Sequence, residues 1–460
     1  MGEGYTLGGK TRLPQSHLKT VMVKIRIILL LFSAATVYAN EYHRAAVDRA
    51  PQKIPDRIVL NWSGDPATTA SVTWRTDASI TTAEGQIAEA DASPNFITWA
   101  RGEEARTEKW KRSGNVAHFH SVTFTGLKPD TLYAYRVGSG DIWSSWYQFR
   151  TASAKPDDFT FIYLGDSQNN LLALWSRTIR TAVLDAPHTD FLLYAGDLVN
   201  HANMDSEWHE WFEAGGWIHA KIPSIPSPGN HEYENDPDTD ERRLSTLWRP
   251  HFTLPENGPE GLAETTYFTD YQGARIISLN SCERHLEQAA WLEKTLQDNP
   301  NKWTIITFHH PVFSASEGRD NADQRKAWKP IFDKYAVDLV LLGHDHTYAR
   351  GNNIGSGVSV RDATMGTVYV VSVSGPKQYK LGQTRWMTRV GENTQLYQVI
   401  TVSGDTLHYR AMTAVGVLYD AFELVKQMGK PNKLIERASP SPERRWENTL
   451  KKKDEDATVF

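Results

Sequence analysis

Residues 159–167 read FTFIYLGDS, an apolar run that ends in Gly165-Asp166-Ser167. Four further motifs come later in the chain, and each follows or closes a similar apolar run: Gly196-Asp197-Leu198-Val199-Asn200, Gly229-Asn230-His231-Glu232, His309-His310-Pro311 and Gly343-His344-Asp345-His346. Every motif carries oxygen or nitrogen donors, and donors at the ends of successive strands converge on one edge of a sheet. A set of Asp, Asn and His at such an edge suits two divalent or trivalent metal ions.

For each motif taken alone, a simple turn or helix cap is an equally good explanation, because Gly-Asp and Gly-Asn pairs are common in turns. Five donor-bearing motifs in a fixed order are a different observation, since unrelated turns do not require a metal donor after each apolar run. We therefore interpret the five motifs as parts of one two-metal site.

Strand-like and helical patterns alternate around these motifs. The helical segments are expected at residues 171–184, 287–296 and 323–335, and the strands at residues 159–165, 190–195, 275–279, 303–308 and 337–342. This alternation predicts an α/β domain in which helices cover a sheet. Later strands, at residues 367–373, 396–403 and 406–412, are expected to complete a second sheet.

The region before the first motif has a different pattern. Short alternating runs between Pro55 and Thr151 are bounded by Gly, Pro, Asp and Ser, which predicts an all-β domain. The stretch from Gly126 to Val137 resembles the tyrosine corner of fibronectin type III sandwiches, with Tyr133 or Tyr135 in the corner position. Trp74 is expected in the core of this sandwich.

The N-terminal segment suggests an exported protein. Residues 1–39 are predicted as a signal peptide, with Met22 as a possible true start, because a basic segment precedes a short apolar run and small residues. That run is shorter than the roughly 20 residues that span a bilayer, so no transmembrane anchor is expected after cleavage. We predict a secreted or periplasmic protein.

Three further segments complete the expected organisation: a fibronectin III-like sandwich at 52–152, a catalytic domain at 157–428 and a charged, solvated tail at 429–460. The formal net charge of −5 argues against a protein that grips nucleic acid mainly by charge. Cys282 is the one cysteine in 460 residues, so no intramolecular disulfide is possible.

The motifs, their order and the preceding sandwich resemble the calcineurin-like metallophosphoesterases, and within them a bacterial-type purple acid phosphatase branch. The resemblance covers residues 55–426. It implies a four-layer αββα sandwich for the catalytic domain, two metal ions drawn from Fe, Zn and Mn, and a small phosphorylated substrate.

Carried over motif by motif, the resemblance assigns ligands to two metals. Asp166 and His346 fall on ligands of the first metal, and Asp197 falls on the carboxylate that bridges both. The second metal receives the remaining ligands: Asn230, His309 and His344. His231, beside Asn230, is expected to be the catalytic residue off the metals.

This sequence departs from the family pattern at several positions. Asn200 stands where purple acid phosphatases have a metal-ligating Tyr whose charge transfer with iron gives the purple colour. The replacement predicts no purple colour and argues against a ferric first metal. Gln168 stands where many other metallophosphoesterases have a His. The amide oxygen of Gln168 or Asn200, or a water molecule, could complete the coordination of the first metal. No His lies between Pro311 and Gly343 to contact substrate; Arg319 and His201 are the candidates for additional contacts.

The resemblance predicts hydrolysis of phosphomonoesters by attack of a metal-bound hydroxide, assisted by His231. A phosphodiesterase with the same site is an alternative, because the motifs are common to both activities. A surface-binding protein with a decayed hydrolase domain is the alternative outside the enzymes, and the short ligand list of the first metal is its support.

Overall fold

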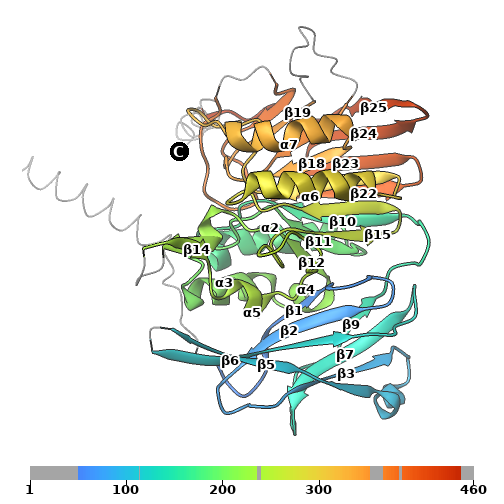
Figure 1. The fold of residues 1–460 in the computed structure, drawn as a ribbon, viewed down its shortest axis with the longest axis vertical. Coiled ribbons are helices and arrows are strands. Elements are labelled where there is room, and N and C mark those ends of the chain that lie inside the picture. Colours follow the sequence, from blue (N-terminus) through green and yellow to red (C-terminus); the bar gives the residue numbers. More distant parts are fainter. Residues whose placement is uncertain (1–49, 113, 236–239, 353–365, 383–385, 447–460) are drawn as a thin grey trace, which may run out of the picture. The chain divides into compact units, whose positions relative to one another are not determined.

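The structure is a computed structural model that describes residues 50–112, 114–235, 240–352, 366–382 and 386–446. Figure 1 shows the all-β region, in blue and cyan, followed in the chain by the α/β region. The predicted signal peptide lies outside the described residues, as do residues 447–460 of the predicted tail. Among the described residues, no helix is both long and apolar enough to cross a membrane.

The all-β region is a sandwich of two sheets. One sheet has the order β1-β2-β6-β5, and the other has the order β4-β3-β7-β8, with β9 also paired to β7. The strands are β1 (Asp56–Asn61), β2 (Ala70–Thr76), β3 (Glu84–Glu89), β4 (Arg101–Glu104), β5 (Arg106–Arg112), β6 (Asn115–Phe124), β7 (Leu132–Ser139), β8 (Ile142–Trp143) and β9 (Tyr147–Arg150), with a short 3-10 helix η1 (Pro94–Trp99) before β4.

The core of this sandwich confirms two sequence predictions. Trp74 is completely buried, in one cluster with residues from both sheets. The hydroxyl of Tyr133 accepts a hydrogen bond from the backbone N–H of Lys128 (2.9 Å), so Tyr133 makes the predicted corner. Tyr135 instead donates to the backbone oxygen of Ala220, in the α/β region.

The α/β region is built on two seven-stranded sheets, with the orders β12-β11-β10-β22-β23-β24-β25 and β15-β16-β17-β18-β20-β19-β21. The strands of the first sheet are β10 (Phe159–Leu164), β11 (Phe191–Tyr194), β12 (Ser224–Pro226), β22 (Leu396–Ser403), β23 (Thr406–Thr413), β24 (Leu418–Gln427) and β25 (Lys430–Arg437). Those of the second are β15 (Tyr267–Tyr271), β16 (Ala274–Ser278), β17 (Trp303–Phe308), β18 (Leu339–Leu342), β19 (Tyr348–Asn352), β20 (Val368–Val371) and β21 (Arg389–Gly391).

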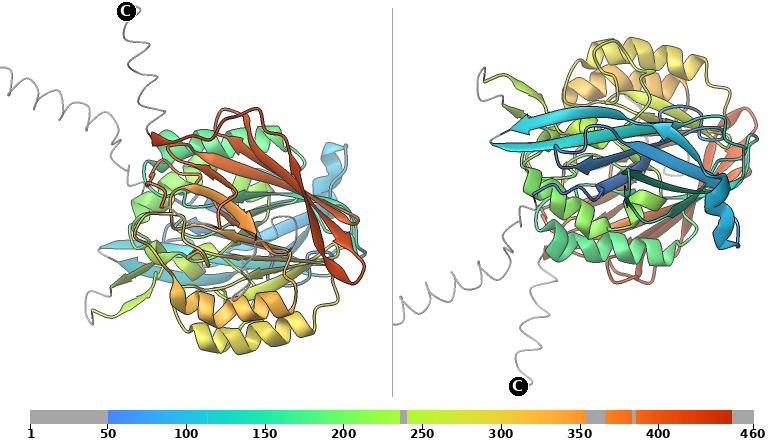
Figure 2. Two further views of the ribbon diagram at one scale, coloured as in Figure 1. Left: turned by 90° about the horizontal axis from the view of Figure 1, so that it is seen from above. Right: turned by 90° about the horizontal axis from the view of Figure 1, so that it is seen from below.

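Helices cover the outer faces of both sheets, which confirms the predicted four-layer arrangement. On one side lie α6 (His285–Gln297) and α7 (Ala322–Lys334), and on the other lies α2 (Ser176–Asp185) with the preceding π-helical turn η2 (Leu171–Trp175) (Figure 2). In the central strands, side chains alternate between faces: Ile306 packs with α6 and α7, whereas its neighbour Ile305 packs with the core between the sheets.

Shorter elements connect these layers: α3 (Asp205–Gly215), α4 (Ile218–Lys221), the 3-10 turn η3 (Asn230–Glu232), the hairpin strands β13 (Tyr233–Asn235) and β14 (Arg242–Leu244), and α5 (Trp248–His251). The two central parallel sets, β10 to β12 and β16 to β18 with β20, run as almost continuous apolar stretches because both of their faces are buried.

A buried ion cluster joins the sandwich to the α/β region. The carboxylate of Asp205, at the start of α3, forms ion pairs with the guanidinium groups of Arg57 (2.7 Å) and Arg75 (2.8 Å). All three side chains are almost fully buried. Asp56 pairs with Arg75 on the sandwich side (2.7 Å). His251 Nε2 lies 3.3 Å from the Arg57 guanidinium. We call Asp56, Arg57, Arg75 and Asp205 the joint cluster.

The prediction of a solvated tail from residue 429 onward is wrong for its first residues. Residues 430–437 form β25, which pairs antiparallel with β24 and extends the first sheet. Leu434 is buried in the main core although the segment around it carries exposed charged residues such as Lys433 and Glu436. The free edge of β24 and the pocket for Leu434 therefore outweigh the polar composition of the segment, as tertiary context commonly does for strands.

Candidate metal centre

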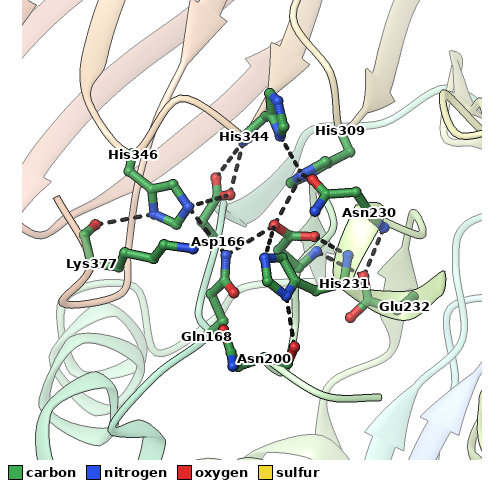
Figure 3. Close-up of polar contacts among 12 residues, drawn as sticks. Asp166, Gln168, Asn200, Asn230, His231, Glu232, His309, His344, His346 and Lys377 are labelled. Atoms are coloured by element: carbon green, nitrogen blue, oxygen red, sulfur yellow. Dashed lines mark hydrogen bonds and ion pairs between the residues drawn. The ribbon is translucent and has the colours of Figure 1, made fainter. Parts of the chain in front are cut away.

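The five sequence motifs meet at one edge of the two sheets, as their positions after strands predict. Asp166 follows β10 and Asp197 follows β11, while Asn230 and His231 lie in η3 after β12. From the second sheet, His309 follows β17, and His344 and His346 follow β18. Figure 3 shows the side chains from both sheets pointing toward one another.

Glycines precede the donors because there is no room for a side chain. A Cβ on Gly229 would overlap the carboxylate of Asp197, and a Cβ on Gly343 would overlap that of Asp166. The Gly-Asp, Gly-Asn and Gly-His pairs are therefore requirements of close packing between the loops of the two sheets, in addition to being turn sequences.

Four donor residues have left-handed backbone conformations: Asp166 (φ 43°), Asp197 (φ 52°), His344 (φ 74°) and His346 (φ 47°). For residues other than glycine this region costs roughly 1–3 kcal/mol each and is concentrated at functional sites. Left-handed non-glycine residues also occur elsewhere, for example at Arg57 (φ 52°), but these four lie together, so the loops that deliver the donors carry a local concentration of backbone strain.

The donor atoms form two overlapping groups, each small enough to hold one metal ion. Asp197, His309 and His344 make one group, and Asp166, Asp197 and His346 make the other; within each, one donor atom per residue lies within 4.8 Å of the others. Asn230 joins the group of Asp197, His309 and His344, because its Oδ1 lies 3.0 Å from His309 Nε2. Asp197 belongs to both groups, as a bridging carboxylate must.

Backbone carbonyls fix which imidazole nitrogen faces the centre. A carbonyl only accepts, so the Nδ1–H of His309 donates to Ala195 (2.9 Å) and the Nδ1–H of His346 donates to Lys377 (3.1 Å). Both rings therefore present an unprotonated Nε2 when neutral, which is the form that binds metals. His344 presents Nδ1, 3.2 Å from His309 Nε2.

Known proteins share this arrangement. Residues 55–151 match the family described as Purple acid Phosphatase, N-terminal domain, and residues 159–348 match Calcineurin-like phosphoesterase. The chain belongs to the calcineurin-like phosphoesterases, in the purple acid phosphatase branch. The predicted family and enzyme class, a phosphoric ester hydrolase, are confirmed.

Relatives of this protein include human acid phosphatase type 7, 26% identical over 340 residues that cover 65% of this chain and 72% of the human protein. The Fe(3+)-Zn(2+) purple acid phosphatase 12 of Arabidopsis thaliana is 26% identical and covers 52% of this chain and 53% of its own. The structure of a purple acid phosphatase from yellow lupin seeds shares the fold, with TM-score 0.67, 20% identity and coverage of 86% and 76%.

The charge distribution of the candidate metal centre fits bound cations. Burial, together with the nearby charge of Asp197, raises the pKa of Asp166 well above its usual range. Burial also opposes ionisation of Asp197, but the charge and hydrogen bond of His309 (3.1 Å) hold its pKa well below the usual range. Against burial, Asp197 raises the pKa of His309 to about 9. In the metal-free centre the carboxylate of Asp197 and the ring of His309 thus stabilise each other's charged form, an attraction that a bound cation would replace.

Gln168 lies inside the group formed by Asp166, Asp197 and His346. Its side chain is completely buried, and its Nε2 lies 2.9 Å from Asp197 Oδ2 and 3.1 Å from His346 Nε2. The amide oxygen has no hydrogen-bond partner among the described residues. An amide oxygen and nitrogen exchange places by a 180° rotation, so the side chain can present its orphaned oxygen to a cation in this group.

His231 lies beside the bridging carboxylate, with its Nε2 3.9 Å from Asp197 Oδ2. Its Nδ1–H donates to the backbone oxygen of Asn200 (2.6 Å), so Nε2 is the nitrogen that faces the centre. Asn200 enters this network through its main chain: its N–H donates to Glu207 (2.6 Å). The structure therefore gives Asn200 a supporting contact to His231.

The other two candidate contacts point elsewhere. His201 is 55% exposed, and its Nδ1 lies 3.8 Å from Glu234. Arg319 donates to the backbone oxygen of His344 (2.6 Å) and lies 3.5 Å from the carboxylate of Asp345. Arg319 thus supports the loop that carries His344, with its guanidinium already partnered.

Two residues that sequence reasoning missed lie at the centre. Glu232 is completely buried and accepts hydrogen bonds from the backbone N–H groups of Asp197 (2.8 Å), Leu198 (2.9 Å) and Gly229 (2.7 Å), which clamps two donor loops together. Glu232 stands within the quoted Gly-Asn-His-Glu motif, which was the available signal. Lys377 has no such signal, since it follows β20 without a recognisable donor motif.

A cavity of about 530 Å³ opens beside the centre. Polar side chains dominate its lining, which includes Asn230, Tyr233, Arg242, His310 and Asn321. Cys282 is also in the lining, but burial raises the pKa of its thiol well above the usual range, so it is not a nucleophile.

Proposed function

We propose that this protein is an exported phosphomonoesterase with two metal ions. Asp166, His346 and the oxygen of Gln168 would hold the first metal, whereas Asn230, His309 and His344 would hold the second. The carboxylate of Asp197 would be shared by both. The observation that carries the proposal is the membership of Asp197 in both donor groups, because two ions about 3.5–4 Å apart are the arrangement that clamps a phosphoryl group.

Two metal ions in these positions would supply Lewis acidity and an activated water. The protein's own groups position the reaction. Asp197 is held by the backbone N–H of His231 (2.9 Å), and Glu232 fixes the turn that precedes it. When protonated, His231 presents its Nε2–H toward the centre, where it donates to a phosphoryl oxygen or to the leaving oxygen.

The polar cavity beside Asn230 receives the leaving group. Its lining includes Tyr233, Arg242 and Asn321, whose polar groups are hydrogen-bonded within the protein. Such a polar lining suits a small hydroxylated or otherwise polar alcohol better than an acyl chain, because an acyl chain would displace water from polar groups without replacing its hydrogen bonds. The substrate class that we propose is therefore small, polar phosphomonoesters.

For the first metal, we propose a divalent ion. The Arabidopsis relative carries Fe(3+) and Zn(2+) in its printed name. Here Asn200 occupies the position of the coloured metal-ligating Tyr and turns its backbone oxygen to His231. A neutral amide from Gln168 neutralises less of a trivalent charge than a phenolate does, so Mn²⁺, Zn²⁺ or Fe²⁺ suits the first position better.

Hydrolysis of matched aryl esters tests the function. Protein dialysed against a chelator and reloaded with Mn²⁺, Zn²⁺ or Fe²⁺ is expected to hydrolyse p-nitrophenyl phosphate faster than bis-p-nitrophenyl phosphate. Faster turnover of the diester would favour the phosphodiesterase alternative. No turnover of either ester with any metal would contradict the proposal.

Export rests on the sequence of residues 1–39. Expression of the full chain in a secreting host, with N-terminal sequencing of the product, tests it. A mature protein that begins near Asn40 is the expected result, and an intact N-terminus would contradict export through this segment.

A further inference from the structure

The loop after β20 is tied to both sides of the first metal position. The backbone N–H of Gly375 donates to the backbone oxygen of Asp166 (2.9 Å), and that of Tyr379 donates to the backbone oxygen of His346 (3.0 Å). Between them, the carbonyl of Lys377 accepts the Nδ1–H of His346. The main chain of Lys377 therefore has a fixed position beside two proposed ligands.

This loop also approaches the centre too closely to allow much rearrangement. A Cβ on Gly375 would overlap the backbone oxygen of Asp166, and Pro376 limits the backbone before Lys377. The side chain of Lys377 thus starts from a rigid position.

The side chain of Lys377 is half-buried and extends toward the interior of the centre (Figure 3). Its amine lies 5.6 Å from the ring centre of Tyr379, and the Arg319 guanidinium lies 4.8 Å from the same ring centre. The Tyr379 ring in turn packs edge-on against His346, with 4.6 Å between ring centres.

Lys377 differs from the nearby Arg319 in having no anionic partner. Among the described residues, no carboxylate lies within ion-pair distance of the Lys377 amine, whereas Arg319 lies 3.5 Å from Asp345. A half-buried ammonium without a counter-ion is an unfavourable arrangement unless an anion completes it. At a centre for phosphoesters, the missing anion is the phosphate itself.

We propose that the ammonium of Lys377 binds a phosphoryl oxygen of the substrate and makes the enzyme prefer the dianionic phosphate of a monoester to the singly charged phosphate of a diester. This inference rests on the proposed function and deepens it. Lys377 takes the place of a substrate-contacting His that is lacking between Pro311 and Gly343. It acts through charge and hydrogen bonding alone.

Binding of inorganic phosphate is the direct test, because it needs no turnover. We compare metal-loaded wild type, Lys377→Met and Lys380→Met by isothermal titration calorimetry. Lys380 is an exposed lysine three residues further along the same loop, so its variant removes one equal charge from outside the centre. Phosphate affinity is expected to fall about 10- to 100-fold in Lys377→Met, the range for a lost charge-assisted hydrogen bond, and to stay within about twofold in Lys380→Met.

Two further readouts separate phosphate binding from a structural role. The metal content of Lys377→Met is expected to equal that of wild type, and Lys377→Arg is expected to recover most of the phosphate affinity. In turnover, Lys377→Met should lower kcat/KM for p-nitrophenyl phosphate about 10-fold more than for bis-p-nitrophenyl phosphate.

Unchanged phosphate affinity in Lys377→Met, or an equal loss in Lys380→Met, would overturn the role of Lys377. Loss of metal from Lys377→Met alone would also overturn it, since the residue would then be structural. These results differ from failure of the proposed function, in which wild type itself hydrolyses neither ester. In that case the calorimetric comparison still decides whether Lys377 binds phosphate.

Discussion

Two buried groups of charged side chains in this molecule have opposite designs. In the joint cluster, Arg57 and Arg75 share Asp205 at 2.7–2.8 Å, so each buried charge has a fixed protein partner. In the metal centre, the Asp166 carboxylate lies 3.7 Å from His346 Nε2, and the amide oxygen of Gln168 has no partner among the described residues.

The difference shows what each cluster is for. In the joint cluster each charged side chain is paired with one of opposite charge, so the cluster holds the sandwich against α3 and does not need a bound ion. The metal centre is open: its donors converge from both sheets, and although Asp197 pairs with His309, the amide oxygen of Gln168 has no partner among the described residues. Removing a carboxylate should therefore destabilise the fold at the joint cluster and abolish ion binding at the metal centre.

The largest effect is expected for Asp197→Asn, which keeps the size of the side chain and removes the charge shared by both donor groups. Turnover of p-nitrophenyl phosphate should fall by well over about 100-fold, because loss of a residue that merely supports a metal ligand already costs 10- to 100-fold. Steady-state kinetics and metal analysis measure it. A variant that retained its metals and most of its turnover would contradict the bridging role.

At the joint cluster, Asp205→Asn should lower the free energy of unfolding by about 3–5 kcal/mol, because it leaves two buried guanidinium groups without their shared partner. Asp405→Asn is the matched control: Asp405 pairs with Lys302 at an exposed site, so its loss should cost under about 1 kcal/mol. Denaturant unfolding of metal-free protein gives both values. Equal costs would show that the joint cluster contributes no more than a surface pair.

Substitutions of Gln168 test whether its unpartnered amide oxygen is a ligand of the first metal, and a smaller effect is expected than for Asp197. Gln168→Ala should weaken binding of the first metal about 10- to 100-fold, the effect usually found for supporting groups around a metal. Gln168→His, which supplies a donor that many related enzymes have, should restore or exceed the wild-type affinity. Competition with a chromogenic chelator measures both. If neither substitution changes the affinity for the first metal, water and not Gln168 completes its coordination.

The smallest effect concerns pH. Burial, followed by the charges of Arg57 and Arg75, lowers the pKa of His251 well below its usual range. The unfolded chain therefore binds the extra proton first, so this contribution to stability is present above about pH 6.5 and is lost as the pH falls below it. His251→Gln should flatten the fall in melting temperature of metal-free protein between about pH 7 and pH 5.

The slope of that pH profile is the quantity to compare, because His251 also stacks on Trp208 and its replacement lowers stability at every pH. His408→Gln, at a half-exposed position on β23, is the control and should leave the slope unchanged. An unaltered slope in His251→Gln would mean that other groups cause the acid sensitivity.

The strand-end donors could be predicted because their signal is local. An apolar run followed by Gly-Asp or Gly-His marks both the strand and its carboxyl end, and parallel strands place those ends together. The same alternation predicted an α/β domain with helices over a sheet, whereas the four-layer arrangement was implied by the family resemblance. The ligand assignments themselves stay predictions until a metal is observed.

Other features depend on contacts that no local pattern encodes. The role of Glu232 arises from three backbone N–H groups of two different loops. Lys377 reads as an ordinary solvated lysine until β20 and its loop are placed beside His346. The charged segment of β25 pairs because β24 offers it an edge.

The count of metal ions bound per chain tests the central claim most directly. Purified mature protein is stripped with a chelator, dialysed against Mn²⁺ or Zn²⁺, and analysed by inductively coupled plasma mass spectrometry. Two ions per wild-type chain, and fewer than one in Asp197→Asn, are the predicted results. One ion or none in wild type, or two ions retained in Asp197→Asn, would contradict a bridged two-metal centre.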